Sequence, residues 1–282
     1  MAAQSSLSQH LIVGPWAHLP WGRKVGAVDY GSQAASPVDE LQVRWFDQFL
    51  KGTDTGVLEQ PPVCLFEMGS NQWRYFDTFP SDNQKSYYLA SSGLASTRDD
   101  ASELVEACPQ SCPEDVLVHD PRRPVPGLGG YASIPAGSFN RSHLDCRTDV
   151  LTYTSTPLAK DLHLAGDVVV EVYCTADKPS FDLCAVLSEV RPDGSAYNFT
   201  QGYVRVNSGE SPVQLSLQAT CVQIAQADCL RLSLSAACFL AYPVNPGTGA
   251  LPRETRIYEA QVITLTVSCG GMRSSQVGLP VV

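Results

Sequence analysis

Strand-like segments fill the chain from Pro61 to its C-terminus. Short apolar or alternating stretches are separated there by clusters of Gly, Pro, Asn and Asp, a pattern typical of β-strands joined by turns. The clearest are VCLFEM (63–68), KSYYLA (85–90), VLTYTS (150–155), DVVVEVYC (167–174), DCLRLSLSAACFLAY (228–242) and TRIYEAQVITLTVS (255–268). About eight to ten strands in roughly 220 residues predict a mainly β domain, a two-sheet sandwich of jelly-roll type.

One pair of these strands carries the signature of a hairpin. FDLCAVLSEV (181–190) and AYNFTQGYVRV (196–206) flank the sequence RPDGS, in which Asp193-Gly194 favours a tight turn. Alternation places Phe181, Leu183, Ala185 and Leu187 on one face. We therefore expect a hairpin with that face in the core.

A single convincing helix precedes the strands, over residues 36–52. Ser36 is the expected N-cap, Pro37 the first helical residue and Gly52 the terminator. Apolar side chains recur at helical spacing, forming a wide stripe of Leu41, Trp45, Phe46, Phe49 and Leu50. Such a face needs another part of the protein to cover it. The polar, Pro-ended segment that follows, 53–60, has the composition of a linker.

Charge and cysteine usage exclude several function classes. The net charge of −10 argues against nucleic acid and anionic membranes as partners. Apolar runs are too short to span a bilayer, and the first residues lack the pattern of a signal peptide, so we expect a cytoplasmic protein. None of the ten cysteines has zinc-ligand spacing, so we expect no metal site.

The first candidate for chemistry is a histidine on a short loop. In HLIVGPWAH (10–18), a brief apolar run breaks at Gly14-Pro15 and presents Trp16 and then His18. A tight loop at the end of a strand can aim an imidazole as a general base. By spacing alone, a surface or structural histidine is the commoner outcome.

The same loop resembles a family segment. GPWAH (14–18) is similar to the GPWxH segment of the cocaine-esterase and X-prolyl dipeptidyl-peptidase (CocE/NonD) family of α/β-hydrolases. Further similar segments follow in the same order: RWFDQFLKG (44–52), PPVCLFEMGSNQWR (61–74), HDPRRPVPGLGG (119–130), CRTDVLTYTSTPL (146–158), FDLCAVLSEVRPDG (181–194), NPGTG (245–249) and LPVV (279–282). The resemblance thus covers nearly the whole chain.

This resemblance implies a domain division and one catalytic residue. Residues 1–52 would be the C-terminal remnant of an α/β-hydrolase domain and 53–60 a linker. Residues 61–282 would be the X-Pro dipeptidyl-peptidase-type jelly roll, which is galactose-binding-like. His18 would be the histidine of a Ser-His-Asp triad, and the family implies no cofactor.

The other two members of that triad are missing from the sequence. No serine lies in a G-x-S-x-G elbow, the motif that exposes a nucleophile between a strand and a helix. In the family's chain order the carboxylate precedes the histidine, yet residues 1–17 contain no Asp or Glu. We therefore expect the chain to be inactive alone. Two alternatives stay open: a truncated hydrolase, or one piece of a split enzyme that is completed by a partner chain carrying the Ser and Asp and docking on helix 36–51.

Substrate-binding candidates come from two loops. In the family, the loop after PVPGLGG faces the active site, which makes Tyr131 and Ile134 candidates for the pocket lining; Trp16 is a third. Among the other histidines, we expect His119 to help start the Asp120-Pro121 turn and His163 to point away from the core.

Two functions are consistent with these observations. The first is the C-terminal part of a serine hydrolase that cleaves small acyl esters or X-Pro peptide amides once completed. The alternative is a non-catalytic jelly-roll module that binds a carbohydrate, a peptide or a partner protein, an argument from the fold alone.

Overall fold

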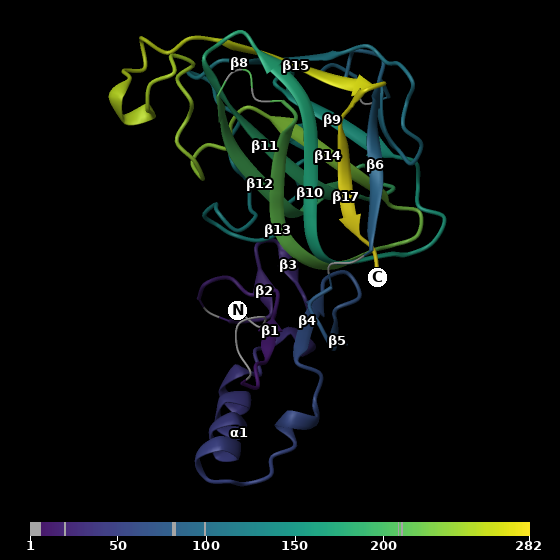
Figure 1. The fold of residues 1–282 in the computed structure, drawn as a ribbon, viewed down its shortest axis with the longest axis vertical. Coiled ribbons are helices and arrows are strands. Elements are labelled where there is room, and N and C mark those ends of the chain that lie inside the picture. Colours follow the sequence, from purple (N-terminus) through teal and green to yellow (C-terminus); the bar gives the residue numbers. More distant parts are fainter. Residues whose placement is uncertain (1–6, 20, 81–82, 99, 208, 210) are drawn as a thin grey trace.

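The protein consists of two parts that differ in architecture. The computed structural model describes residues 7–19, 21–80, 83–98, 100–207, 209 and 211–282. We call residues 7–80 the small lobe and residues 83–282 the sandwich. Figure 1 shows the sandwich above the small lobe, with helix α1 (Val38–Leu50) at the end farthest from the sandwich.

The sandwich contains the predicted β architecture, with more strands than the sequence pattern revealed. Its strands are β6 (Gln84–Ser91), β7 (Ser102–Val105), β8 (Asp115–His119), β9 (Val150–Ser155), β10 (Leu162–Ala176), β11 (Ser180–Val190), β12 (Ala196–Asn207), β13 (Val213–Ile224), β14 (Cys229–Ser235), β15 (Ile263–Gly270), β16 (Arg273–Ser274) and β17 (Gln276–Pro280). The pairing order is β12-β11-β14-β9-β7-β6-β17-β10-β15-β16, with β13 added to β10 and β8 to β15. The short helices α2 (Ser142–Asp145) and η4 (Pro252–Glu254) lie in its loops.

Strand β10 joins the two layers of the sandwich. Its first part pairs with β13 and β17, and Tyr173–Ala176 pairs with β15. The register shifts after Gly166, which marks a β-bulge. Gly166 has φ +125°, a conformation that favours glycine. A Cβ at this position would overlap the Pro80 carbonyl oxygen, so no side chain fits. One long, bulged strand therefore belongs to both sheets.

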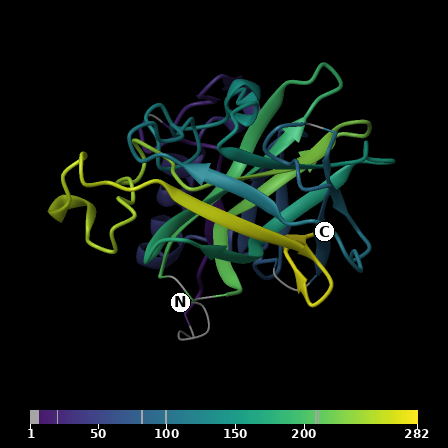
Figure 2. The ribbon, with the colours of Figure 1, turned by 90° about the horizontal axis from the view of Figure 1, so that it is seen from above.

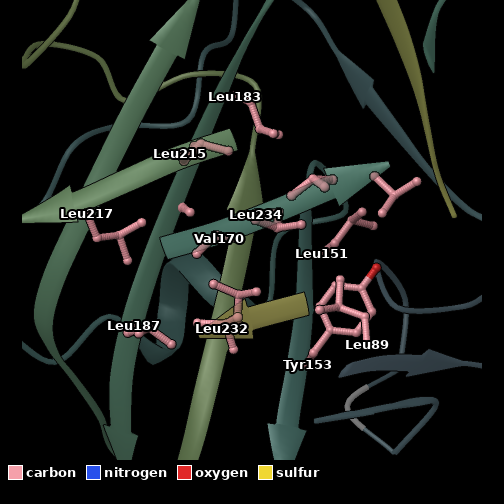
Figure 3. Close-up of a cluster of buried hydrophobic side chains, with 14 of the residues drawn as sticks. Leu89, Leu151, Tyr153, Val170, Leu183, Leu187, Leu215, Leu217, Leu232 and Leu234 are labelled. Carbon is pink, nitrogen blue, oxygen red and sulfur yellow. The ribbon is translucent and has the colours of Figure 1, made fainter. Parts of the chain in front are cut away.

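The core lies between these layers and confirms the predicted hairpin. Phe181, Leu183, Ala185 and Leu187 on β11 are all buried in one cluster, part of which is drawn in Figure 3. Strands β11 and β12 pair in antiparallel register from Ser180–Asn207 to Val190–Ala196. Each large apolar side chain buried here stabilises the fold by about 1.5–3 kcal/mol.

Two predicted strands are shorter than expected. The segment 228–242 leaves the sheet after Ser235, because residues beyond it bond instead to a neighbouring loop, with Phe239 N–H donating to the Val125 carbonyl at 3.0 Å. The segment 255–268 becomes a strand only at Ile263, since the Glu259 carboxylate accepts from the Arg256 N–H and holds a turn. The intervening chain extends away from the sandwich in Figures 1 and 2.

The small lobe is built on a separate three-stranded sheet. β1 (Leu11–Val13) runs parallel to β4 (Val63–Glu67), and β5 (Gln72–Phe76) pairs with β4 in antiparallel register. A hairpin of β2 (Lys24–Val25) and β3 (Val28–Asp29), with the short helices η2 (Ser32–Ala34) and η3 (Val57–Glu59), completes it. The segment 63–68, expected in the jelly roll, therefore pairs with the strand before His18.

Helix α1 is confirmed in the predicted place, with one shift at its start. Pro37 occupies the N-cap position, and the Ser36 hydroxyl accepts from the Val38 N–H at 3.3 Å. Gly52, with φ +69°, follows its C-terminal end as predicted. None of its residues is buried, and Phe46, Phe49 and Leu50 are 55%, 50% and 78% exposed. The part of the apolar stripe formed by Phe46, Phe49 and Leu50 is therefore uncovered in this chain, whereas Leu41 and Trp45 are half-buried. Within the described ranges, no helix combines the length and apolarity needed to cross a membrane.

Candidate functional site

The loop that carries His18 is fixed by the tryptophan two residues before it. The Trp16 ring folds back over Gly14, where a Cβ would overlap the indole. Its Nε1–H donates to the Ala34 carbonyl at 2.6 Å, and its ring contacts that of Trp73 with centroids 5.9 Å apart. The Gly-Pro-Trp sequence thus turns the chain sharply after β1 and anchors it on the small lobe.

His18 lies at the exposed end of this loop. Its backbone carbonyl accepts from the Trp21 indole N–H at 2.9 Å. Among the residues that the structure describes, no hydroxyl or carboxylate is hydrogen-bonded to its ring. The backbone at His18 is therefore anchored, and its exposed imidazole is open to a group from outside the described chain.

Three of the four predicted site residues line one cavity between the small lobe and the sandwich. Its volume is about 290 Å³, and its lining includes His18 and Trp16 from one side and Tyr131 from the other. Ile134 is not in this lining and is fully exposed. The structure thus brings together Trp16 and His18 from one loop and Tyr131 from another, far away in the sequence. The functional roles of all four residues stay predictions.

The loop bearing Tyr131 is docked onto the small lobe. Ala27 N–H donates to the Ser138 carbonyl at 3.1 Å, beside a bridge between Gly26 and Ser138. Gly26 has φ +62°, and a Cβ there would lie 2.8 Å from the Ser138 oxygen. The hairpin β2–β3 can approach this closely because the residue is glycine. This contact forms one edge of the cavity.

Tyrosines fix the outer part of the same loop. The hydroxyls of Tyr131 and Tyr242 are 2.8 Å apart, and the Tyr242 ring stacks on that of Tyr203 at 4.0 Å. Burial raises the pKa of Tyr242, so its hydroxyl stays protonated. The Tyr131 side chain is thereby oriented at the cavity by a neutral hydrogen bond.

A buried carboxylate forms the second attachment of the small lobe to the sandwich. Glu67 on β4 is 2% exposed and accepts from Arg74 Nη1 at 2.9 Å and from the Ser70 hydroxyl at 2.6 Å. The same carboxylate lies 2.9 Å from Nδ1 of His163 on β10. His163 points away from the core, as predicted, and contacts the small lobe.

His119 corrects a prediction. Its ring is buried at the end of β8, with neither nitrogen hydrogen-bonded. The turn after it is held by Asp120, whose carboxylate accepts from the Arg122 N–H at 3.0 Å. Burial lowers the pKa of His119, because desolvation disfavours the charged imidazolium. The histidine therefore contributes to packing and not to the turn.

The sequence did not predict the polar wall that the sandwich contributes to the cavity. Asn198 and Gln201 on β12, and Gln218 and Thr220 on β13, all line it. A polar residue at an outward strand position has the same pattern whether it faces solvent or a cavity. No signal in one sequence could have distinguished these four.

A second groove lies between α1 and the small sheet. It has a volume of about 440 Å³, and its lining includes Ile12, Leu41, Trp45 and Tyr75. The Trp45 ring contacts the His10 ring edge-on at 5.3 Å. Here Leu41 and Trp45 of α1 face strand β1 across the groove.

Comparison with known proteins identifies the domain. Residues 55–277 match the family model of the X-Pro dipeptidyl-peptidase C-terminal non-catalytic domain. The fold and this match define a mainly β, non-catalytic C-terminal domain. The chain belongs to the CocE/NonD family of serine hydrolases, of which this domain is the C-terminal part.

Individual relatives show how much of such a protein the chain represents. It is 25% identical to the cocaine esterase of Rhodococcus sp. (strain MB1 Bresler), covering 100% of this chain and 53% of the esterase. An aminopeptidase from a marine sediment Thaumarchaeota archaeon shares the fold, with a TM-score of 0.83 at 19% identity, covering 100% of this chain and 50% of that one. An α-amino acid ester hydrolase aligns with a TM-score of 0.81 at 22% identity, over 97% of this chain and 50% of the other. The chain therefore spans about half the length of these proteins.

Proposed function

We propose that this chain supplies the general base and one substrate-contacting wall of a serine hydrolase that cleaves acyl esters or X-Pro peptide amides. The observation that carries the proposal is the common cavity of His18, Trp16 and Tyr131. A triad histidine has to lie at the edge of the pocket that holds the acyl group. Family membership and this placement support the same role.

The chemistry assigned to His18 is proton transfer. One ring nitrogen accepts the serine proton as the serine oxygen attacks the substrate carbonyl, and the same nitrogen then returns the proton to the leaving group. Hydrogen bonds from the Trp16 indole and to the His18 carbonyl anchor the backbone that carries the imidazole. Trp16 and Tyr131 contact the acyl part of the substrate.

The nucleophile and the acid are proposed to come from outside these 282 residues. The sequence holds no G-x-S-x-G elbow and no carboxylate ahead of His18. An imidazole without a hydroxyl to deprotonate and an acid to orient it has no triad to serve. The 282 residues by themselves are therefore expected to give no turnover.

Two features of the small lobe support a docking site for the segment or chain that carries the Ser and Asp. Among the described strands, β1 pairs only with β4, so its other edge is open, and Leu11 and Val13 are 43% and 47% exposed. Leu41 and Trp45 of α1 lie beside it across the second groove. An open strand edge next to an apolar helix face is suited to adding a strand of a partner.

Complementation tests this function. The chain is assayed with p-nitrophenyl acyl esters and X-Pro-p-nitroanilides, alone and with a partner that carries a G-x-S-x-G serine and an aspartate. Turnover is expected only in the mixture, and the His18→Ala variant is expected to abolish it. Turnover by the chain alone that His18→Ala removes would overturn the claim of inactivity, and failure of every partner to restore activity counts against the hydrolase role.

The alternative is a non-catalytic jelly-roll module that binds a carbohydrate, a peptide or a partner protein; the non-catalytic nature of the domain that residues 55–277 match is consistent with it. It makes the opposite prediction in the same assay. The mixture would then show no turnover, and the His18→Ala variant would behave as the wild type does in this assay.

A further inference from the structure

Two free thiols meet on the outer face of strand β11. Cys184 alternates with Leu183 and Ala185, which face the core, so its side chain points to the opposite face. There it belongs to a small buried cluster with Val186 and Cys238. The two cysteines are free, and they are 2% and 6% exposed. This cluster therefore holds two sulfurs apart from the main core.

The chain after β14 folds back to bring Cys238 to this place. Cys184 pairs across the sheet with Ser235, the last residue of β14. The Ser235 hydroxyl donates to the Ala237 carbonyl at 2.9 Å. Gly127 packs against the Cys238 sulfur, since an added Cβ there would lie 3.0 Å from it. Cys238 is thus placed by contacts with two segments of the chain.

The two thiols are hydrogen-bonded to each other. The Cys184 S–H donates to the Cys238 sulfur. This bond lowers the pKa of Cys238 against the effect of burial, and the charge of Arg141 lowers it further. The same bond raises the pKa of Cys184, as does burial. Because the thiolate is the reactive form of cysteine, Cys238 is the more reactive of the two.

We propose that Cys184 and Cys238 form a modification site, a dithiol that a peroxide converts into an intramolecular disulfide. The Cys238 thiolate attacks one peroxide oxygen and becomes a sulfenic acid, while the O–O bond breaks. The leaving oxygen takes up the proton that the Cys238 thiol gave up and departs as water or an alcohol. The Cys184 sulfur then attacks the Cys238 sulfur, and the sulfenic hydroxyl leaves as water with the Cys184 proton. Both thiols are oxidised, and one peroxide is reduced.

The oxidant reaches this pair from the surface. Cys238 is followed by Phe239 and Leu240, which are 41% and 81% exposed. The side chains that cover the sulfurs include Ala241 and Tyr242 of the same loop. This loop lies beyond the end of β14, so it can open locally while the sheet stays paired. A peroxide is little larger than water, and only Cys238 has to meet it.

The disulfide would form beside a tyrosine that contacts the cavity wall. Cys184 is the cross-strand neighbour of Tyr203, whose ring stacks on that of Tyr242. The Tyr242 N–H donates to the Cys238 carbonyl at 3.0 Å, and its hydroxyl lies 2.8 Å from that of Tyr131. A covalent S–S bond is much shorter than the S–H···S contact that it replaces, so the backbone of Cys238 moves when the bond forms. Oxidation is therefore expected to shift Tyr131, which lines the cavity between the lobes.

Peptide mapping by mass spectrometry tests the modification without any turnover, so its outcome is independent of the hydrolase role. The full chain is treated with a stoichiometric amount of hydrogen peroxide, and the remaining thiols are alkylated in denaturant. We expect a peptide linked through Cys184 and Cys238, lighter by two hydrogen atoms than its reduced parts, which dithiothreitol separates. Alkylation of both cysteines after a treatment that oxidises the exposed Cys108 or Cys146 would overturn the proposal.

Two substitutions assign the disulfide and its effect. Cys184→Ala should abolish the linked peptide. Cys174→Ala is the matched control, because Cys174 is also buried but belongs to the main core, and the linked peptide should persist. A disulfide between Cys238 and another cysteine of the folded wild type would contradict the assignment.

The effect on the cavity is followed by NMR. The ring resonances of Tyr131, assigned with Tyr131→Phe, are expected to shift when the wild type is oxidised. They should stay in place when Cys184→Ala is treated in the same way. Formation of the disulfide without a shift of the Tyr131 resonances would overturn the connection between this dithiol and the cavity.

Discussion

The Glu67 carboxylate on β4 and the His163 ring on β10 lie 2.9 Å apart across the boundary between the small lobe and the sandwich. Glu67 also accepts from Arg74 at 2.9 Å. One buried carboxylate therefore connects strands of both lobes, a short distance from the cavity that the lobes share.

Neutralising Glu67 is expected to loosen the contact between the lobes. In Glu67→Gln the charge-assisted hydrogen bonds from Arg74 and His163 are lost or weakened, which should lower the free energy of unfolding by about 1.5–3 kcal/mol. Urea denaturation followed by circular dichroism measures the change. Glu103→Gln, at an exposed position, is the control and should change stability by less than about 0.5 kcal/mol. Equal effects of the two substitutions would contradict a connecting role for Glu67.

His119 is expected to make the fold sensitive to mild acid. Burial lowers its pKa from the ordinary value of 6.5, so the unfolded chain takes up the proton at a higher pH than the folded one. The contribution of neutral His119 to the free energy of unfolding is therefore complete above pH 6.5 and is lost as the pH falls below 6.5. Unfolding free energies at pH 8, 6.5 and 5.5 should fall more steeply in the wild type than in His119→Phe. His143→Phe, at an exposed histidine, should keep the wild-type dependence.

Glu189 is expected to act in the opposite direction. Burial, with a hydrogen bond shared with Asp228, raises its pKa from 4.5 to about 7, so the folded state holds the proton longer than the unfolded state. The contribution of protonated Glu189 to the free energy of unfolding is complete below pH 4.5 and is lost as the pH rises towards 7. At pH 8, Glu189→Gln should be more stable than the wild type by about 1–2 kcal/mol, with no gain at pH 4.5. A gain of equal size at both pH values would argue against titration of Glu189.

Gly130 is expected to tolerate no side chain. It combines φ +68° with close packing of its Cα on the Gln201 carboxamide. Gly194, with φ +82°, has open space around it, so Gly194→Ala should cost about 1 kcal/mol from backbone strain alone. Gly130→Ala should cost about 2–4 kcal/mol, because overpacking adds to the same strain. Thermal unfolding measures the loss of stability in the two variants. Equal losses in Gly130→Ala and Gly194→Ala would show that the Gln201 side chain moves aside.

The exposed face of α1 is expected to influence association but not folding. Phe46 and Leu50 are 55% and 78% exposed, so Phe46→Gln with Leu50→Gln should change the unfolding free energy by less than about 1 kcal/mol. Concentration-dependent self-association, measured by analytical ultracentrifugation, should fall, because large apolar patches drive such contacts. A stability loss as large as that of a core substitution would show that the face is packed.

Predictability from the sequence differed between core and site. The β11–β12 hairpin and the interior positions Phe181 to Leu187 follow from alternation, because a strand buried on one face repeats every two residues. Helix α1 follows from its terminal residues and its apolar period. The ends of β14 and β15 could not be foreseen, since residues after Ser235 and before Ile263 bond to distant loops that no local pattern reveals.

The sequence by itself determined a β-rich chain with one helix, the loop that presents His18, and membership of a hydrolase family. Those properties depend on local periodicity, turn residues and short motifs. Only the tertiary structure placed Trp16, His18 and Tyr131 on one cavity, joined β4 to β1, and buried Glu67, His119 and Gln201. Such placements depend on contacts between residues far apart in the chain, and each contact exists only because the packing of the whole molecule brings its two sides together.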